Sequence, residues 1–360
     1  MKKFSSPLLS KIYILTAVLV TLAIVGVYYI LSGNLNGSGE KKAIKVGLIL
    51  YDEFDPFTNQ IASETEKTLS ELAYKNNVSI NVEMQYSNKS QLRQNDQFAE
   101  MIAKDYDVIC VNPVDRTDAM QIVDRAKEAD IPVIFFNREL VNEDMNRWDK
   151  LYYVGADAEQ SAIIQANIVI DAFSDESMID KLDFNHDGVI QYVMLEGEAG
   201  HQDAIVRTRV AVERIEAAGF EMEKLGDEIA NWNREQAATK MTSILNGHPW
   251  QVELVIANDD NMALGAIDAL DAFRVKDFPQ IVGVNGKREA LEYIDKNIIL
   301  GTAYNNAPEK GHTIGRMAYY LGMDMDIPKD IYLVDGNKVY IPYERVDKSN
   351  VKDYFDKASD

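Results

Sequence analysis

Short apolar runs alternate with longer amphipathic segments along the first half of the chain after residue 43. The apolar runs lie at 44–50, 78–85, 106–112 and 131–137, and segments with helical spacing of apolar residues lie at 57–76, 89–104 and 118–128. Apolar runs that follow one another through helices predict a parallel sheet with helices on both faces.

The same alternation begins again near residue 151 and continues almost to the end of the chain. Strands are predicted at 151–156, 189–197, 254–259, 280–285 and 300–305, with helices near 158–172, 203–218, 234–245, 261–272, 287–295 and 308–322. The tail adds the apolar runs 331–334 and 338–346. We therefore predict an α/β protein with two doubly wound, Rossmann-like units of similar size rather than a single barrel.

A different pattern precedes these two units. Residues 12–31 are 20 uncharged, mostly apolar residues that follow Lys2, Lys3 and Lys11. They match the length that crosses a ~30 Å hydrocarbon core, they exceed the ~7–15 residues of a signal-peptide core, and no A-x-A-like site follows them. We expect residues 1–31 to be a membrane anchor, with a cleaved signal as the alternative, and residues 32–43 to be a flexible tether. In both cases the rest of the chain is exported.

The charge balance narrows the choice of partner. Of the 360 residues, 58 are acidic and 37 are basic, which gives a net charge of -21. An acidic surface argues against a nucleic-acid partner and suits a neutral or cationic ligand. The single cysteine, Cys110, lies inside an apolar run, so we predict a buried side chain without a disulfide or a catalytic role.

Ligands of doubly wound sheets bind beyond the carboxyl ends of the strands, so the residues at these positions are candidates for a site. They are mostly short polar side chains: Asp55, Phe57, Asn137, Arg138, His201, Asp203, Arg207, Asp259, Asn285 and Asn305. The sequence has no G-x-G-x-x-G motif after a strand, no Walker A, G-x-S-x-G or H-E-x-x-H motif, and no metal-ligand spacing among its four histidines. This pattern favours ligand binding over cofactor chemistry.

The segment "DFNHDGVIQ", residues 183–191, has the spacing of a calcium loop. The oxygen ligands would come, in order, from Asp183, Asn185, Asp187, the Val189 carbonyl and Gln191. Gly188 stands at the sharp turn, but the twelfth position, where an EF-hand has a bidentate Glu, holds Met194. Two interpretations remain at this point: an ordinary Asp/Asn/Gly turn, or a calcium site whose last carboxylate comes from elsewhere in the chain.

Several segments resemble the periplasmic glucose/galactose-binding proteins, which are type I solute-binding proteins of sugar ABC importers. The resemblance extends from about Lys45 to Phe355, and it is carried by "FFNRE" (135–139), "YYVGAD" (152–157), "DFNHDGVIQYVMLEGEAGHQDAIVRT" (183–208), "ELVIANDDNMALGAIDAL" (253–270) and "KVYIPYERVD" (338–347). It implies the type I periplasmic-binding-protein fold, with one lobe from 44–156 and 306–340 and a second lobe from 157–305 and 341–360. Three hinge crossings, near 154–157, 304–307 and 340–344, would join the lobes.

The resemblance also implies an answer for the calcium loop. In this family a Glu that is distant in sequence closes the loop, and the matching residue is Glu253 in "ELVIAND". The implied ligands of a structural Ca²⁺ are therefore Asp183, Asn185, Asp187, Val189, Gln191 and Glu253. Such an ion would attach the loop to a strand and raise stability without taking part in chemistry.

The family holds a hexose between two aromatic faces, and the matching residues here are Phe57 and Trp232. The matching polar residues are Asp55, Asn137, His201, Asp203, Arg207, Asp259, Asn285 and Asn305. At two positions the chain departs from the family, because Asp259 stands where Asn is usual and Asn285 stands where Asp is usual. The paired exchange keeps one carboxylate and one amide, and it leaves the identity of the hexose open.

The function implied by the resemblance is extracytoplasmic capture of a neutral hexose, glucose or galactose foremost, by hinge closure and without catalysis. The protein would act as a monomer and deliver the sugar to ABC permease and ATPase subunits. The alternative is a sensing module that signals to a membrane chemoreceptor or histidine kinase. A glycosidase would use a pair among Asp55, Asp203 and Asp259, none of which the sequence singles out, and a repressor would need an N-terminal helix-turn-helix that is absent.

Overall fold

A computed structural model describes residue 21 and residues 43–175, 182–275 and 278–358 of the chain. Among these residues, no helix is long and apolar enough to span a membrane. The predicted anchor and tether lie outside the described residues, except for Thr21 and Ala43.

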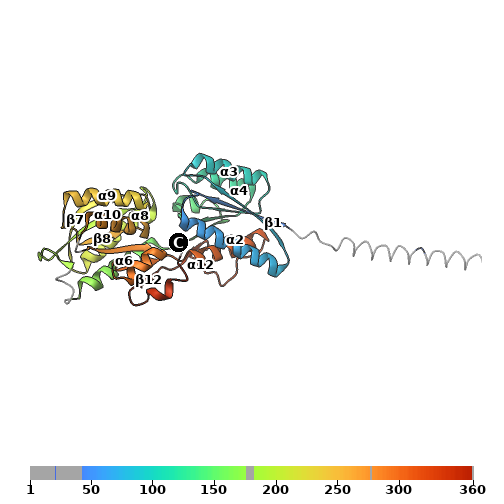
Figure 1. The fold of residues 1–360 in the computed structure, drawn as a ribbon. Coiled ribbons are helices and arrows are strands. Elements are labelled where there is room, and N and C mark those ends of the chain that lie inside the picture. The colour runs from blue at the N-terminus through green and yellow to red at the C-terminus, as the bar shows by residue number, and fades with distance from the viewer. Residues whose placement is uncertain (1–20, 22–42, 176–181, 276–277, 359–360) are drawn as a thin grey trace, which may run out of the picture.

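Two lobes lie side by side, each built around a six-stranded sheet (Figure 1). The sheet of the N-terminal lobe has the order β11-β5-β4-β3-β1-β2, and all of its strands are parallel. The strands are β1 (Ala43–Leu50), β2 (Ser79–Tyr86), β3 (Val108–Val111), β4 (Val133–Phe136), β5 (Leu151–Gly155) and β11 (Lys338–Tyr340). The helices are α2 (Pro56–Asn76), α3 (Gln91–Ala103), α4 (Met120–Ala129), α5 (Asn142–Met145) and α12 (Ala307–Gly322).

The sheet of the C-terminal lobe has the order β12-β10-β9-β8-β6-β7. Its strands are β6 (Val189–Glu196), β7 (Glu221–Ile229), β8 (Leu254–Ala257), β9 (Gln280–Asn285), β10 (Gly301–Tyr304) and β12 (Glu344–Asp347). The helices are α6 (Ala158–Phe173), α8 (Gln202–Ala217), α9 (Arg234–Gly247), α10 (Asp260–Phe273) and α11 (Arg288–Asp295), followed by the 3₁₀ turn η1 (Val351–Tyr354). The predicted α/β fold with two lobes of parallel strands is confirmed, with one difference: the edge strand β12 is antiparallel to β10.

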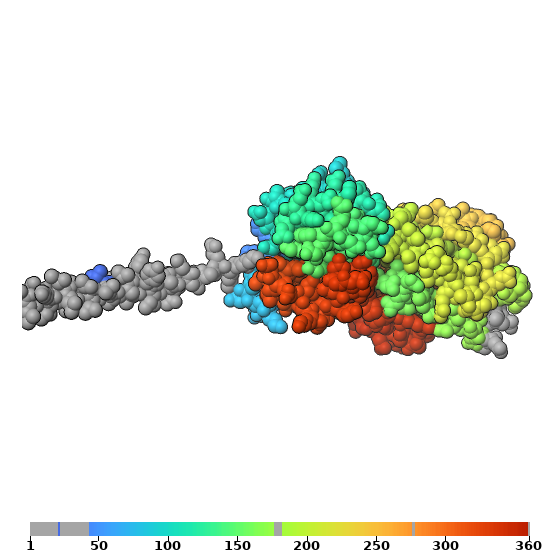
Figure 2. All heavy atoms as spheres, turned by 180° about the vertical axis from the view of Figure 1, so that it is seen from behind, coloured from blue at the N-terminus to red at the C-terminus, as the bar shows by residue number. Residues whose placement is uncertain are grey.

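The chain passes between the two sheets three times within the described residues. The passages follow β5, follow β10 and separate β11 from β12. Figure 2 shows the result from behind, where the red C-terminal residues cover part of one lobe and continue onto the other. Because each passage is short, the lobes are held close together with their strand ends facing a common space.

Burial explains why the strands could be predicted. Helices cover both faces of each sheet, so a central strand is apolar along its length, and residues 46–50 of β1 are all buried. Cys110 in β3 is also buried, as predicted, and burial raises the pKa of its thiol.

One strand of the C-terminal lobe was not predicted, and the tail contributes a strand to each sheet. Strand β7 was missed because its sequence, EMEKLGDEI, is charged on both faces, as an exposed edge strand permits. The tail forms two strands, β11 and β12, which belong to different sheets, and the chain passes between the lobes within the predicted crossing near 340–344. Pro342 lies between the two strands, where the chain needs no ladder hydrogen bond from its nitrogen.

Candidate functional site

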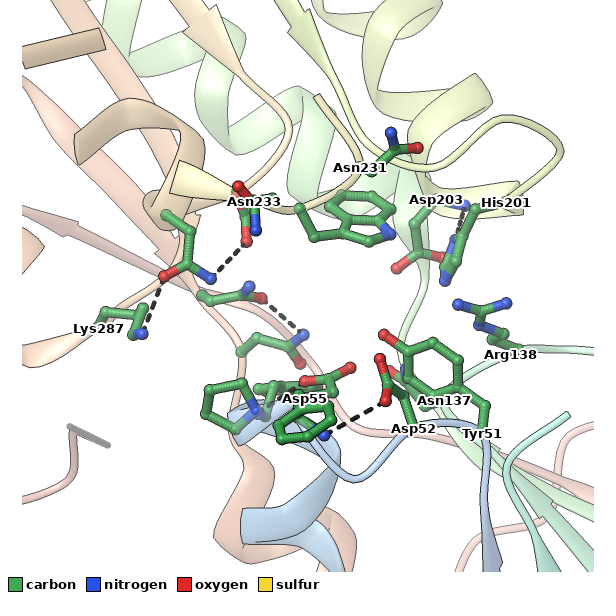
Figure 3. Close-up of a pocket in the computed structure, with 18 of the residues that line it drawn as sticks. Tyr51, Asp52, Asp55, Asn137, Arg138, His201, Asp203, Asn231, Asn233 and Lys287 are labelled. Carbon is green, nitrogen blue, oxygen red and sulfur yellow. Dashed lines mark hydrogen bonds between the residues drawn. The ribbon is translucent and has the colours of Figure 1, made fainter. Parts of the chain in front are cut away.

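A cavity of about 190 Å³ lies between the lobes, at the carboxyl ends of both sheets. Its walls contain all ten residues that the sequence predicted for a sugar site: Asp55, Phe57, Asn137, His201, Asp203, Arg207, Trp232, Asp259, Asn285 and Asn305. In Figure 3, Tyr51, Asp55 and Asn137 lie on one side of the cavity, and His201 and Asp203 lie on the opposite side. The structure therefore brings together side chains that are up to 250 residues apart in sequence (305 minus 55).

Three of the predicted residues are the N-caps of helices that point into the cavity. Asp55 accepts a hydrogen bond from the backbone N–H of Phe57 (2.9 Å) at the start of α2. Asp259 accepts one from the backbone N–H of Met262 (3.0 Å) at the start of α10. Each carboxylate thus has the positive end of a helix beside it, and the second oxygen of Asp259 accepts from the side-chain amide of Asn261 (3.2 Å).

His201 caps α8 with its ring. Its Nδ1 accepts a hydrogen bond from the backbone N–H of Asp203 (3.1 Å), so the ring is neutral and carries its proton on Nε2. Burial, together with the positive charges of Arg138 and Arg207, holds the pKa of His201 well below its usual value. His201 is therefore a neutral N–H donor on the wall of the cavity.

Arg207 is the centre of a buried hydrogen-bond network, with 3% of its surface exposed. Its guanidinium donates to Asp203 (2.8 Å), to the hydroxyl of Tyr343 (2.6 Å) and to the hydroxyl of Ser161 (2.9 Å). The Asp203–Arg207 pair is therefore not an exposed i,i+4 salt bridge, because packing from the hinge fixes both side chains. Sequence analysis missed Tyr343, which lies in the passage between β11 and β12.

The two aromatic residues come from different lobes. Phe57 lies in the first turn of α2, and Trp232 lies in the loop between β7 and α9. Trp232 has a left-handed backbone (φ 59°), and its ring lies so close to Gly197 that a Cβ there would be 2.0 Å from the indole. The ring also meets His201 edge to face, with centroids 5.1 Å apart. Gly197 and His201 thus hold the indole in position.

Asp259 and Asn285, the two exchanged positions, lie beyond the neighbouring strands β8 and β9. Burial, followed by the charge of Asp260, raises the pKa of Asp259 to about 7. Asn285 has an unusual backbone (φ 113°), and its Oδ1 accepts a hydrogen bond from Nδ2 of Asn305 (3.1 Å). In the cavity wall, burial and a neighbouring charge therefore act on Asp259, whereas an unusual backbone and a bond to Asn305 fix Asn285.

The turn that presents Asn285 depends on Asp260, which sequence analysis did not identify. Its buried carboxylate accepts hydrogen bonds from the backbone N–H groups of Gly286 (2.7 Å) and Lys287 (2.8 Å) and from the hydroxyl of Thr302 (2.9 Å). A Cβ on Gly283 would be 2.1 Å from this carboxylate, so only glycine leaves room for it. The hydrogen bonds from Gly286 and Lys287 to Asp260 stabilise the turn in which Asn285 has its strained backbone.

One ion pair connects the lobes across the mouth of the cavity. Arg138 of the N-terminal lobe donates to the carboxylate of Glu198 in the C-terminal lobe (2.6 Å). Its guanidinium also donates to the Val114 carbonyl (2.7 Å) and stacks over the ring of Tyr51 (4.1 Å). Arg138 had been placed at a strand end from sequence, but its role between the lobes had not been predicted.

The predicted calcium loop and Glu253 lie together at the N-terminal end of β6, which is the end opposite the cavity. The carboxylate of Glu253, with 1% of the residue exposed, accepts hydrogen bonds from the backbone N–H groups of Phe184 (2.5 Å) and Gln191 (3.1 Å). Asp187 accepts from the side-chain amides of Asn185 (2.8 Å) and Gln191 (2.9 Å). The loop and Glu253 therefore form one cluster, in which Asp187 and Glu253 already accept hydrogen bonds from other loop residues.

This loop is not arranged as a finished metal site. In the part of the chain that the structure describes, no group of three or more His, Cys, Asp or Glu side chains has the geometry to hold a metal ion. Burial raises the pKa of Glu253 to about 7, and the charges of Asp183 and Asp187 add to the shift. The negative charges of these carboxylates repel one another, and a cation bound between them would reduce that repulsion.

The sequence of this chain is similar to the sequences of known binding proteins. Residues 46–324 match the family described as the periplasmic binding protein domain. The D-galactose/methyl-galactoside binding periplasmic protein of Haemophilus influenzae is 31% identical over 312 residues, which cover 86% of this chain and 91% of that protein. The ribose import binding protein of Bacillus subtilis is 24% identical over 289 residues, which cover 79% of this chain and 82% of that protein.

Solved structures share the fold. An ABC transporter solute binding protein from Bacillus halodurans, solved with bound myo-inositol, has a TM-score of 0.74 and 25% identity, and the match covers 89% of this chain and 99% of that one. A periplasmic solute binding protein from Actinobacillus succinogenes, solved with bound D-allose, has a TM-score of 0.72 and 21% identity over 86% of this chain and 100% of that one. Because these proteins are named for different ligands, the likeness leaves the ligand open.

Proposed function

Because this chain belongs to the periplasmic binding protein family, and within it to the sugar-binding proteins of ABC importers, we propose that it captures a neutral hexose for import. The observation that carries the proposal is the convergence of all ten predicted residues on one cavity between the lobes. The small cavity volume favours a ligand of monosaccharide size over an oligosaccharide. Glucose and galactose are the proposed hexoses, since the relative named for D-galactose shares 31% identity.

The walls of the cavity offer what a sugar ring requires. Phe57 and Trp232, from opposite lobes, supply flat apolar surfaces for the two C–H faces of the ring. Around its edge, His201 supplies an N–H donor and Asp55 supplies a carboxylate acceptor. Each sugar hydroxyl both donates and accepts, so this mixture of donors and acceptors suits an uncharged polyol.

Ligand binding would favour the closed arrangement of the lobes, because the sugar contacts both of them at once. The Arg138–Glu198 pair adds a contact that is made only while the lobes are close. An importer would recognise this closed form. We propose no chemical step for the bound sugar, because the carboxylates of the cavity serve as helix caps and as a partner of Arg207.

We also propose that the loop 183–191 and Glu253 hold a structural calcium ion. The donor set fits, because three carboxylates, two amides and one carbonyl are the oxygen ligands that Ca²⁺ accepts. To ligate, Asn185 and Gln191 would have to turn their amide oxygens inward, since their nitrogens now face Asp187. A bound ion would neutralise the carboxylates and link the loop to β8.

The family implies an extracytoplasmic location. We propose that residues 1–31 anchor the protein to the outer face of the cytoplasmic membrane and that a permease and an ATPase are its partners. The anchoring proposal rests on the length and apolar character of residues 12–31. The importing proposal rests on the family.

The test is a calorimetric titration of the full chain with glucose, galactose, ribose, xylose and myo-inositol. We expect glucose or galactose to bind with one sugar per chain, about tenfold or more tighter than the pentoses and the cyclitol. Tightest binding of a pentose or of myo-inositol would overturn the hexose assignment. Failure of all five to bind would overturn the sugar-binding function.

A further inference from the structure

A buried lysine lies directly behind the sugar cavity. Lys310 is on α12 and has 2% of its surface exposed. Its ammonium lies over the ring of Phe57 (5.1 Å to the centroid) and near the ring of Tyr343 (5.8 Å). No ion pair with a described carboxylate balances it, and its hydrogen bond goes to Oδ1 of Asn305 (2.5 Å). Burial of an ammonium without an ion-pair partner costs free energy, so this lysine is not an ordinary surface side chain.

The hydrogen bond from Lys310 begins a chain that ends in the cavity. An ammonium can only donate, so Asn305 must turn its Oδ1 toward Lys310. Its Nδ2 then donates to Oδ1 of Asn285 (3.1 Å). Rotating the Asn305 amide by half a turn would bring its N–H₂ against the ammonium and would break both bonds. Lys310 therefore determines which atom donates and which accepts in both of these hydrogen bonds.

The last group in this chain is the amide nitrogen of Asn285. Because its Oδ1 is turned toward Asn305, Asn285 keeps both hydrogens of its N–H₂ for a ligand, and this nitrogen can only donate. Among the residues that the structure describes, no acceptor takes a hydrogen bond from this nitrogen, and Asn285 lines the cavity. Asp259 lines the same cavity from the neighbouring strand and offers carboxylate oxygens.

We propose that Lys310 is a positioning residue that fixes Asn285 as a hydrogen-bond donor toward the ligand and thereby selects the ligand group that faces it. This inference deepens the proposed sugar-binding function and rests on it. The selected group is a hydroxyl that accepts from Asn285 and donates to Asp259. A protonated amino group at the same ring position is disfavoured, because it has no lone pair to accept from Asn285 and, where Lys310 is protonated, because the two positive charges repel each other.

The charges around Lys310 agree with this role. Burial is the largest influence on Lys310 and lowers its pKa to about 7, while the charge of Asp203 raises the pKa and that of Arg207 lowers it. Both of these charged groups come from α8, and Tyr343 faces Lys310 from the passage between β11 and β12. Lys310 is thus enclosed by groups that already belong to the site.

The experiment compares the full chain with its Lys310→Met variant, which removes the donor and the charge but keeps an unbranched side chain that is shorter by one atom. The probes are the hexose that binds tightest and its amino-deoxy analogues at each ring position, with affinities from calorimetry at a pH below the pKa values of both the amines and Lys310. For the wild type we expect one analogue to bind about 100-fold more weakly than the hexose. In Lys310→Met this penalty should shrink about tenfold or more at that position alone. Lys67→Met, at an exposed lysine on α2, is the control and should leave all ratios unchanged.

A second measurement separates a positioning role from a purely structural one. The side-chain amide signals of Asn285 and Asn305 in ¹H–¹⁵N spectra should shift or broaden in Lys310→Met without any sugar, because both amides are then free to turn. Unchanged amide signals, or an amino-sugar penalty that stays the same at every position, would overturn the inference. If the wild type binds no neutral hexose, the proposed function fails, and the amide signals alone then decide whether Lys310 orients the two asparagines.

Discussion

The interlobe cavity and the loop 183–191 both gather carboxylates, yet the two regions balance the negative charge in opposite ways. In the cavity, Asp203 is paired with Arg207 at 2.8 Å, and Asp259 caps a helix. In the loop, the influences on the pKa of Glu253 are burial, two backbone hydrogen bonds and two further carboxylates, and no cation is among them.

This difference indicates the charge of the ligand that each region suits. In the cavity an arginine neutralises Asp203 and a helix N-terminus partly offsets the charge of Asp259, so this site offers hydrogen bonds with less attraction for a cation than the loop has. A site with uncompensated carboxylates is stabilised by binding one. The same lobe thus presents a region for a neutral polyol and a region for a hard cation, and each can be disturbed without the other.

The largest predicted effect is stabilisation of the folded protein by calcium at the loop 183–191, with no change in sugar binding at the cavity. Calcium at about 1,000 times its dissociation constant should raise the free energy of unfolding by about 4 kcal/mol, as measured by urea unfolding, and a chelator should reverse this. Glu253→Gln should remove the response while leaving sugar affinity unchanged. The control Glu213→Gln, at an exposed residue of α8, should keep the response. Equal unfolding curves with calcium and with chelator would remove the calcium proposal.

The pH dependence of the loop sharpens the same test. The pKa of Glu253 is raised to about 7 in the folded protein, above its usual value of 4.5, so the folded state binds the extra proton between these values. Without calcium, Glu253 should therefore make stability fall as pH rises from about 4.5 to about 7. Because calcium needs the ionised carboxylate, its stabilising effect should be larger at pH 7.5 than at pH 5.5. A calcium effect that is independent of pH in urea unfolding would argue against Glu253 as a ligand.

The second largest effect concerns the aromatic wall of the cavity. Trp232→Ala should weaken hexose binding by about 2–3 kcal/mol, which is about 30- to 150-fold in calorimetry, because it removes one face of the ring contact. Calcium stabilisation should not change. Trp250 has the same left-handed backbone but an exposed ring, so Trp250→Ala is a matched control that should bind normally. Comparable losses in both variants would mean that the indole is not a ligand contact.

The paired exchange at Asp259 and Asn285 predicts a smaller effect with a distinctive pattern. Asp259→Asn and Asn285→Asp should each weaken hexose binding about tenfold, because each leaves two donors or two acceptors facing one hydroxyl. The double variant restores one of each and should return to within about threefold of the wild type. Strictly additive losses in calorimetry would show that the two positions act independently.

The smallest effect concerns the contact between the lobes. Glu198→Gln should weaken hexose binding by about 0.5–1 kcal/mol, or roughly two- to fivefold, because the Arg138 pair is partly exposed and screened. The difference between variant and wild type should decrease in 1 M salt. A loss that is the same at low and high salt would indicate that Glu198 acts through hydrogen bonding or packing rather than charge.

Much of the fold was predictable because the signal was local. The central strands are apolar on both faces, and the residues of the cavity follow the ends of those strands as short polar side chains. Strand β7 gave no such signal, because an edge strand of charged residues has the same composition as a loop. The tail was only partly predictable, because its pairing depends on both sheets at once.

The supporting residues of the cavity could not be predicted from local sequence. Asp260 is defined by its bonds to a turn 26 residues away, and Tyr343 by its bond to Arg207, 136 residues away. Lys310 follows Asn305 closely, but nothing in the sequence shows that α12 buries its ammonium behind the ligand. These residues become visible only when packing has placed their partners.

The measurement that tests the central claim most directly is a crystal structure of the protein grown with saturating glucose or galactose. The account predicts one sugar ring between Phe57 and Trp232, with a hydroxyl bonded to both Asn285 and Asp259 and with the lobes closed over it. Density for the sugar elsewhere on the molecule, with the cavity between the lobes free of it, would contradict the account.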